Sequence, residues 1–566
     1  MRGRAGALTA LALLLFSASA PTKGNEVARP TFHDRAFIDH CNLRRIEPAQ
    51  DGGFGYDDLK IQVERIKLNL RIAEELGVTQ YVIFSRLFEH LVNYDVPGEA
   101  ARPFPTDHHH RHRREILAGA LDEVLREASA RGIAVIFHTN QFSFPHEVYD
   151  AYGDRMRGSA RVCPGKEFTW RLFRAQFEEF FDRFPTVAGL QLTTSETQVS
   201  ITQCDCPDCA GMSEVDRYVK MVEEAWTVCR ARGKELQLRT WGNLAGRSEA
   251  DAYEQMTQAI PEGVYISTKN TSGDFDIMAN PTHLIGMGER EQVIEFDAWR
   301  EYTGWNQMPC YMGDIFAERL RLCRDRGIGR VALRVNWNPG VRPIFDTPWG
   351  NWANVYVFMK LAQDVDADPD GFLREYIAGA FPQAARDAAF RFYKASTPAQ
   401  ITWLTLLGDN CNDHSRVFRV FSARDYEERC RKQLADAVGS GYTFPAADIA
   451  ARHAAIDEQA AGMEALVAEM APHVPAEWTT DMRRQMGNEV FCAHALTDCL
   501  KIFGWMLAMG RGEAGPGEAD LSDMRGRFGE ADGAWRAFDS EGYEILCGPN
   551  RLDMLRELEE KSAATR

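Results

Sequence analysis

Short apolar runs alternate with longer amphipathic stretches through roughly the first two thirds of the 566-residue chain. Most of the runs are followed by a loop and then by a segment with helical spacing, such as 115–131 or 171–184. About eight such strand–helix units within some 330 residues are typical of a closed (β/α)8 barrel. The expected strands are Ala36–Asp39, Tyr81–Phe84, Ala134–His138, Gly189–Leu192, Leu236–Arg239, Tyr265–Ser267, Val293–Phe296 and Val331–Val335.

The main alternative for this alternation is a doubly wound open sheet. That fold usually carries a glycine-rich phosphate turn after its first strand, and none follows residue 39. From about residue 365 the strand signals stop, and the segments 413–438, 446–470 and 480–509 show helical spacing. We therefore predict an α/β fold, with a (β/α)8 TIM barrel over residues 31–364 followed by an α-helical C-terminal domain over residues 365–566.

The N-terminus has the layout of a secretory signal peptide. Arg2 and Arg4 supply a short basic region, residues 7–16 are apolar, and residues 17–20 are small enough for cleavage. A membrane-spanning helix needs about 20 apolar residues, and the apolar part here is much shorter. We expect residues 1–20 to be a cleaved signal peptide, which predicts a secreted or periplasmic protein with no stable membrane insertion.

Charge and motif content exclude several other functions. The net charge is −17 and no long Lys/Arg run occurs, so a nucleic acid is not an expected partner. No Gly-x-Ser-x-Gly elbow follows a strand, which speaks against a Ser/His/Asp hydrolase. No motif calls for a cofactor. The sequence leaves open whether the chain forms a homodimer.

The chemistry of a (β/α)8 barrel is built at the carboxyl ends of its strands. Carboxylates, amides, basic groups and aromatic rings gather at these positions here, and they suit a sugar: Trp and Tyr cover its C–H face while Asn, His and Arg bind its hydroxyls. An oligosaccharide or polysaccharide fragment is therefore the expected partner. The candidate residues are His138, Asn140, Glu196, Arg239, Trp241, Lys269, Asn270, Asp274, Glu301, Tyr302, Asn336 and Trp337.

Three of these candidates, Glu196, Asp274 and Glu301, are carboxylates that follow the fourth, sixth and seventh strands. Glycosidic cleavage needs two carboxyl groups on opposite sides of the bond. One protonates the leaving oxygen, and the other attacks the sugar or activates water. These three residues are the predicted catalytic carboxylates of a hydrolase acting on O-glycosyl bonds.

The same strand ends resemble glycoside hydrolase family 67, the α-glucuronidases that remove glucuronic acid branches from xylan fragments. The similar segments lie between residues 132 and 304. They are Gly-Ile-Ala-Val-Ile-Phe-His-Thr-Asn-Gln-Phe-Ser-Phe-Pro (132–145), Gly-Leu-Gln-Leu-Thr-Thr-Ser-Glu (189–196), Lys269-Asn270 with Asp274-Phe275, and Glu295-Phe296-Asp297 with Arg300-Glu301-Tyr302-Thr303-Gly304.

The resemblance implies an inverting, exo-acting hydrolase in which Glu196 is the general acid and Asp274 or Glu301 draws a proton from water. It also implies that Lys269 and Arg239 bind the carboxylate of the sugar. Where the family has a further lysine, this chain has Leu192. We expect no counterpart of the family's N-terminal β-rich domain. Two further hypotheses are a hexosaminidase-type barrel with another carboxylate pair and a carbohydrate-binding barrel without turnover.

Three features have competing interpretations. Cys204, Cys206 and Cys209, with Cys163 or Cys229 as a possible fourth member, fit a disulfide best in an exported protein, and structural zinc second. The tract 107–112, Asp-His-His-His-Arg-His, is expected to be a solvated loop rather than a metal site. Trp337, Trp349 and Trp352 are suited equally to sugar platforms and to packing.

Overall fold

The computed structural model describes residues 30–40, 56–84, 87–194, 201–240, 250–272, 275, 279–298, 308–336, 344–406, 409–410, 446–510, 515–526, 556 and 560. The predicted signal peptide lies outside the described residues. So do six of the predicted site residues: Glu196, Trp241, Asp274, Glu301, Tyr302 and Trp337.

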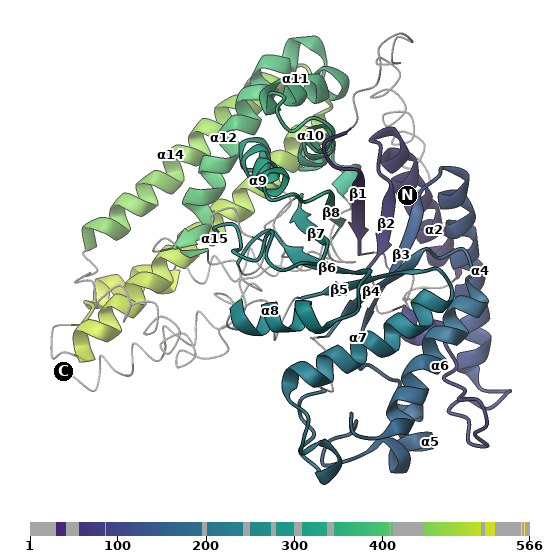
Figure 1. The fold of residues 1–566 in the computed structure, drawn as a ribbon. Coiled ribbons are helices and arrows are strands. Elements are labelled where there is room, and N and C mark those ends of the chain that lie inside the picture. Colours follow the sequence, from purple (N-terminus) through teal and green to yellow (C-terminus); the bar gives the residue numbers. More distant parts are fainter. Residues whose placement is uncertain are drawn as a thin grey trace, which may run out of the picture.

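Eight parallel strands close into a barrel in the order in which they occur in the chain (Figure 1). All eight expected strands are confirmed, with ends that differ from the expected ones by two residues at most. The predicted (β/α)8 fold is therefore confirmed. The strands are β1 (Asp34–Asp39), β2 (Gln80–Ile83), β3 (Ala134–Asn140), β4 (Gly189–Thr193), β5 (Glu235–Arg239), β6 (Val264–Lys269), β7 (Gln292–Asp297) and β8 (Arg330–Asn336).

The strands are buried on both faces because helices surround the parallel sheet. Small and branched side chains of β1, β2, β3, β7 and β8 form one cluster, which includes Ala36, Ile38 and Val82. The intervening residue Phe37 belongs instead to the large core shared with the helices. The two-residue alternation of a strand thus divides the apolar side chains between the barrel interior and the outer layer.

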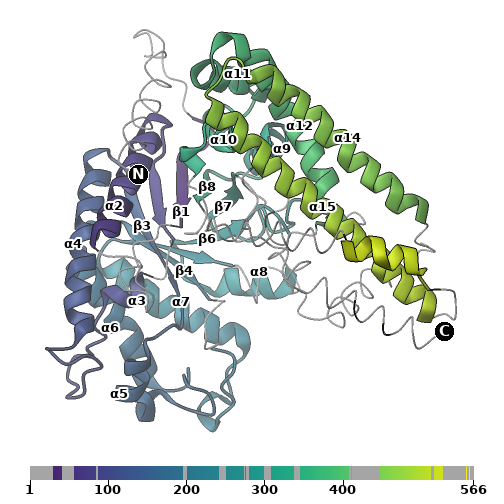
Figure 2. The same ribbon diagram turned by 180° about the vertical axis from the view of Figure 1, so that it is seen from behind.

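Helices lie around the outside of the barrel in both views (Figures 1 and 2). Amphipathic spacing places one face of each against the strands; α6, for example, buries all five of its phenylalanines in the core. The helices of this part are α2 (Tyr56–Glu75), α3 (Phe88–Leu91), α4 (His109–Ala130), α5 (His146–Met156), α6 (Glu167–Arg183), α7 (Glu214–Ala231), α8 (Ala250–Ala259), α9 (Gly313–Asp325) and α10 (Trp352–Gln363).

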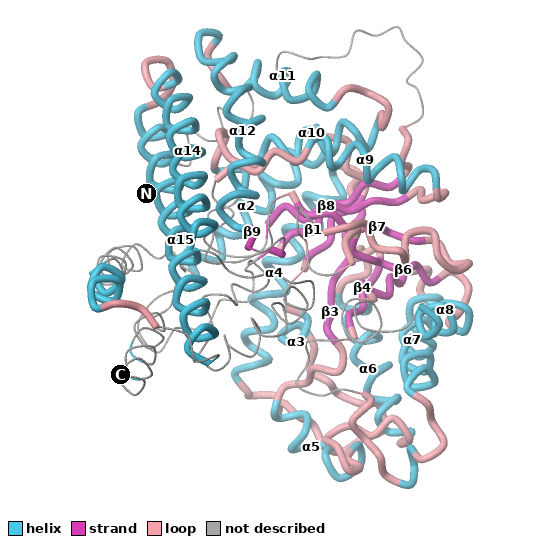
Figure 3. The backbone as a smooth tube through the Cα atoms, turned by 90° about the vertical axis from the view of Figure 1, so that its left-hand side faces the viewer, coloured by secondary structure: helices cyan, strands magenta, loops and turns pink. Residues whose placement is uncertain are grey.

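The C-terminal part is mainly helical, as predicted. α14 and α15 pack side by side against α12 (Figure 3). The expected helix 413–438 lies outside the described residues. An unexpected feature is a short antiparallel pair, β9 (Thr405–Leu406) with β10 (Asp409–Asn410), because two-residue strands are too short to show alternation. The helices are α11 (Pro369–Ala380), α12 (Arg386–Leu404), α14 (Ala446–Met470) and α15 (Ala476–Gly510). No helix in the described ranges is long and apolar enough to cross a membrane.

The prediction of a solvated loop at the histidine tract is wrong. α4 begins at His109, and His108 caps it by accepting a hydrogen bond from the backbone N–H of His110 on its Nδ1 atom at 3.2 Å. His110 is buried, stacks on Phe104 with ring centroids 3.6 Å apart, and places Nε2 2.8 Å from the carbonyl oxygen of Val92. Burial lowers the pKa of His110 to about 4. The tract therefore starts a helix and anchors it.

Candidate active site

Strand register brings polar side chains of neighbouring strands together at the carboxyl end of the barrel. These residues are the last or nearly the last of their strands, where the backbone leaves the sheet and side chains meet at one rim. The aligned pairs are Asn140 with Thr193, Arg239 with Ser267, Lys269 with Glu295, Asp297 with Arg334, and Asp39 with Asn336.

A buried carboxylate, Glu295, is central to this rim. The Nε atom of Arg239 lies 2.9 Å from both carboxylate oxygens, and the Ser267 hydroxyl donates to Oε1 at 2.5 Å. Burial by itself would raise the pKa of Glu295. The guanidinium groups of Arg239 and Arg334, with the Ser267 hydrogen bond, outweigh it and lower that pKa below its ordinary value. Glu295 is therefore ionised and holds Arg239 in place.

An aromatic column stands beside this ion pair. The ring of Phe84 stacks between His40, at 4.1 Å, and His138, at 3.6 Å. The guanidinium carbons of Arg239 and Arg334 lie 5.2 and 5.4 Å from the same ring centroid, within cation–π range. The column fixes two imidazoles and two guanidinium groups within one small volume at the rim.

His138 and Asn140, at the end of β3, have polar atoms suited to bind a ligand. His138 uses Nε2 to contact the hydroxyl of Thr193 at 2.7 Å. Its Nδ1 and the side-chain oxygen of Asn140 are buried and have no hydrogen-bond partner among the described residues. Burial, followed by the charges of Arg239 and Arg334, places the pKa of His138 well below 6.5. The imidazole is thus neutral and able to hydrogen-bond a sugar hydroxyl.

Asn336 and Asn270, two predicted substrate-binding residues, are engaged by the protein itself. Asn336 donates to Asp39 at 2.9 Å and accepts from the backbone N–H of Ile344 at 3.1 Å. Asn270 donates to the backbone oxygen of Glu295 at 2.9 Å and accepts from Arg319 at 2.6 Å. These contacts favour a role for both amides in holding the rim together.

Asp39 completes this scaffold at the end of β1. Its carboxylate accepts hydrogen bonds from Asn69 and Asn336, each at 2.9 Å, and from the hydroxyl of Tyr81. Three neutral donors therefore replace the hydrogen bonds of water around a carboxylate that is almost entirely buried. Asp39 thus links β1, β2, β8 and α2 at the rim.

Lys269 connects the rim to the ring of Phe275. Its ammonium nitrogen lies 4.6 Å from the ring of Phe275, and the guanidinium of Arg334 lies 5.0 Å from the same ring. Phe275 directly follows Asp274 in the sequence. The neighbour of Asp274 in the chain is thus part of the rim.

Sequence reasoning assigned no role to two charged residues at the rim, Glu295, which it named only within a family 67 segment, and Arg334. Both are fully buried, and each has an apolar residue on either side of it in its strand. A charge flanked by apolar residues in a parallel strand is costly to bury and could have identified both. Trp349 and Trp352, by contrast, are buried in the core, which favours packing over sugar platforms for these two.

One group in the described part of the chain has the geometry of a metal site. It consists of Cys163, Cys204, Cys206 and Cys209, whose sulfur atoms all lie within 4.8 Å of one another. The four thiols lie outside the rim network and are considered separately below.

No family model and no curated protein sequence match the chain. Its fold is similar to that of a GH138 enzyme targeting pectin rhamnogalacturonan II, with a TM-score of 0.58 at 12% identity over 95% of this chain and 84% of that one. The likeness shows the fold. An O-GlcNAc hydrolase mutant from Thermobaculum terrenum has a TM-score of 0.44 at 8% identity, covering 94% of this chain and 95% of that one.

Proposed function

We propose that the chain is a glycoside hydrolase whose active site is the carboxyl rim of the barrel. The observation that carries the proposal is the buried network of Arg239, Glu295, Arg334 and Lys269 beside His138. A set of buried charges at this end of a (β/α)8 barrel is typical of catalysis, since burial of charge costs stability and needs another reason.

The rim chemistry favours a sugar that bears a carboxylate. Arg239, Lys269 and Arg334 place three cations on neighbouring parts of the rim, and His138 and Asn140 present neutral polar atoms for hydroxyl groups. Phe275 offers an apolar face beside two of the cations. This combination supports the specificity that the family 67 resemblance implies, an exo-acting enzyme similar to α-glucuronidases on oligosaccharides that contain uronic acid.

The catalytic carboxylates of the proposal are Glu196, Asp274 and Glu301. Glu196 follows Thr193, the last residue of β4, after two intervening residues, so the extended chain allows it a reach of about 11 Å from that strand end. Asp274 is bonded to Phe275 at the rim. We assign Glu196 as the acid that protonates the leaving oxygen, and Asp274 or Glu301 as the base that deprotonates the attacking water.

Structural likeness adds support for a carbohydrate as the substrate class. The GH138 neighbour targets a pectin polysaccharide, and we extend only the class of substrate from it to this chain. We also propose that residues 1–20 direct export to a secreted or periplasmic location. Sequencing the N-terminus of the mature protein would test this step, because retention of Met1 contradicts export by cleavage.

The proposal is tested by offering the purified protein aryl glycosides of uronic acids, neutral sugars and N-acetylhexosamines, together with aldouronic acids. We expect release of a uronic acid whose first-formed anomer, followed by NMR, is inverted. A retained anomer would overturn the inverting assignment. Hydrolysis confined to N-acetylhexosaminides would indicate a hexosaminidase-type enzyme, and sugar binding without any hydrolysis would indicate a binding protein.

A further inference from the structure

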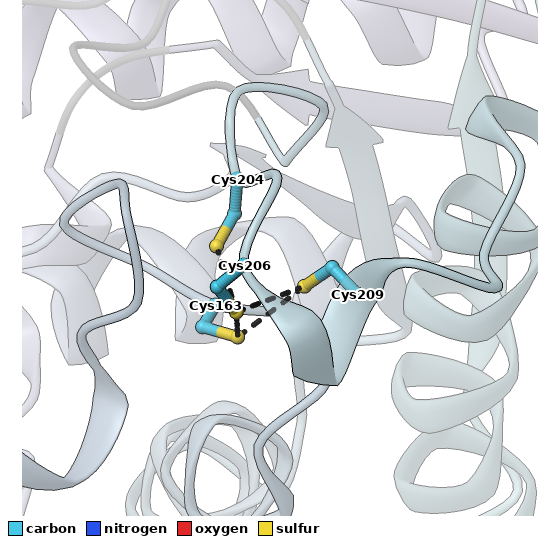
Figure 4. Close-up of side chains that lie close together, drawn as sticks. All are labelled: Cys163, Cys204, Cys206 and Cys209. Carbon is cyan, nitrogen blue, oxygen red and sulfur yellow. Dashed lines mark hydrogen bonds between the residues drawn. The ribbon is translucent and has the colours of Figure 1, made fainter.

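Four cysteines converge outside the rim (Figure 4). The sulfur of Cys163 lies 3.4 Å from that of Cys206 and 3.3 Å from that of Cys209. Cys206 also lies 3.6 Å from Cys204 and 3.9 Å from Cys209, sulfur to sulfur. Three of the four side chains are fully buried and Cys206 is half-buried.

These distances match those around a single tetrahedral ion. Zinc–sulfur bonds of about 2.3 Å at tetrahedral angles place sulfur atoms about 3.8 Å apart. Four of the six sulfur–sulfur separations, at 3.3–3.9 Å, lie close to this value, and the other two are no longer than 4.8 Å. A multi-iron cluster would hold its four thiolates further apart, because several metal ions must fit between them. The space among the sulfurs therefore suits one ion.

The ligands come from two connections of the barrel. Cys163 lies between α5 and α6, and the other three lie between β4 and α7, with Cys209 ending a single 3-10 turn (Pro207–Cys209). Glycines allow the close approach of the two segments. A Cβ atom on Gly158 would lie 2.6 Å from the sulfur of Cys204, and one on Gly165 would lie 2.3 Å from the backbone oxygen of Asp208.

A buried arginine and a serine hold the ligand loop in shape. The guanidinium of Arg217, in α7, donates to the backbone oxygens of Ile201 at 3.2 Å and of Cys204 at 2.7 Å. Ser159 accepts from the backbone N–H of Asp205 at 2.8 Å, and its hydroxyl lies 3.6 Å from the sulfur of Cys204. Such outer contacts orient the ligands of metal sites in general.

We propose that Cys163, Cys204, Cys206 and Cys209 bind one structural Zn²⁺ ion as four thiolates. Four protein ligands leave no open coordination position, so the site stabilises the fold and does not take part in catalysis. The ion joins the α5–α6 connection to the β4–α7 connection, which begins at the rim directly after β4. This inference does not depend on the proposed glycosidase activity.

The site is tested on the full chain purified without a histidine tag or chelator. We expect about one zinc ion per chain by elemental mass spectrometry, as for any structural site with four thiolate ligands. Cys163→Ser should retain less than a tenth of that zinc. Cys229→Ser is the matched control because Cys229 is a buried cysteine of α7 outside the cluster, and it should keep the full zinc content.

Two further measurements keep the test decisive if the serine variant fails to fold. Wild-type protein reconstituted with Co²⁺ should show the thiolate charge-transfer bands of a tetrahedral site. Its four cluster thiols should resist alkylation until the metal is removed. Metal-free protein whose peptides contain these cysteines as disulfides, or a folded Cys163→Ser protein with unchanged zinc content, would overturn the proposal.

Discussion

The two ends of the barrel contain opposite arrangements of charge. At the amino end, Arg330 lies between two carboxylates, 3.0 Å from Asp34 and 3.1 Å from Glu235. At the carboxyl end, the carboxylate of Glu295 interacts instead with two guanidinium groups, those of Arg239 and Arg334. At the amino end a cation, Arg330, is surrounded by carboxylates, and at the carboxyl end an anion, Glu295, is surrounded by guanidinium groups.

The two ends also differ in burial. The side chains of Arg330, Asp34 and Glu235 are 12%, 22% and 16% exposed, whereas those of Arg239 and Glu295 are 3% and 0% exposed. Water still screens the amino-end pairs, so they tie strands together at small cost. Complete burial at the carboxyl end costs far more, and the proposed active site gives a reason for that cost. Under the proposed function, the amino end serves stability and the carboxyl end serves catalysis.

Glu295→Gln should have the largest effect on stability. The change leaves the charge of Arg239 buried without its counter-ion, which we expect to lower the free energy of unfolding by about 3–5 kcal/mol. Chemical denaturation of wild type and variant measures the loss. A loss below about 1 kcal/mol would show that the buried pair contributes no more than a surface pair, and the contrast between the ends would fail.

Lys269→Gln should act on selectivity more than on stability. If Lys269 binds the sugar carboxylate, its loss removes a charged hydrogen bond worth about 1.5–3 kcal/mol, or roughly 10- to 150-fold in kcat/KM. This loss should appear on uronides and be much smaller on neutral glycosides. Equal losses on both classes would contradict an acidic-sugar site.

Arg330→Gln is the matching change at the amino end. Because its ion pairs are partly solvated, we expect a loss of only about 1–2 kcal/mol in the free energy of unfolding. The proposed site of catalysis is at the other end, so kcat/KM should stay within about threefold of wild type under folding conditions. A large fall in kcat/KM with folded protein would mean that the two ends do not divide stability from function.

The smallest effect concerns pH. Burial lowers the pKa of His138, and also that of His40, well below the unfolded value of about 6.5. Above pH 6.5 both states hold a neutral ring. Below it only the unfolded chain gains the proton, so stability falls by up to about 1.4 kcal/mol per pH unit for each histidine.

Unfolding of wild type and His138→Gln between pH 6.5 and 5.5 measures this contribution. The variant should show a shallower fall, smaller by up to about 1.4 kcal/mol per pH unit. Arg330→Gln, which removes no histidine, should have the wild-type slope. Parallel slopes for wild type and His138→Gln would contradict a buried neutral imidazole at the rim.

The strands were predictable from the sequence because burial on both faces makes each of them an apolar run with sharp ends. The rim followed from the same pattern, since a residue such as Arg239 or Lys269 at a strand end is placed by the fold itself. Glu295 and Arg334 were not predicted as site residues because they lie before the strand ends. Their apolar neighbours make each segment resemble an ordinary buried strand.

Two other outcomes depended on contacts distant in sequence. The histidine tract starts a helix because Phe104 and Val92 contact His110, and neither contact can be read from the spacing of the histidines. The sequence did not decide whether Cys163 or Cys229 is the fourth member of the cysteine cluster. Only the packing of two connections, separated by a helix and a strand, selects Cys163.

The most direct test of the glycosidase site is to measure how the loss of activity in Glu196→Gln depends on the leaving group of the substrate. General acid catalysis contributes about 10²- to 10⁴-fold, and mainly when the departing alcohol is a poor leaving group. We predict such a loss of kcat on sugar-linked substrates and a much smaller loss on aryl uronides with acidic phenols. Equal losses on both substrates, or wild-type rates on sugar-linked ones, would contradict Glu196 as the acid and the carboxyl rim as the site of cleavage.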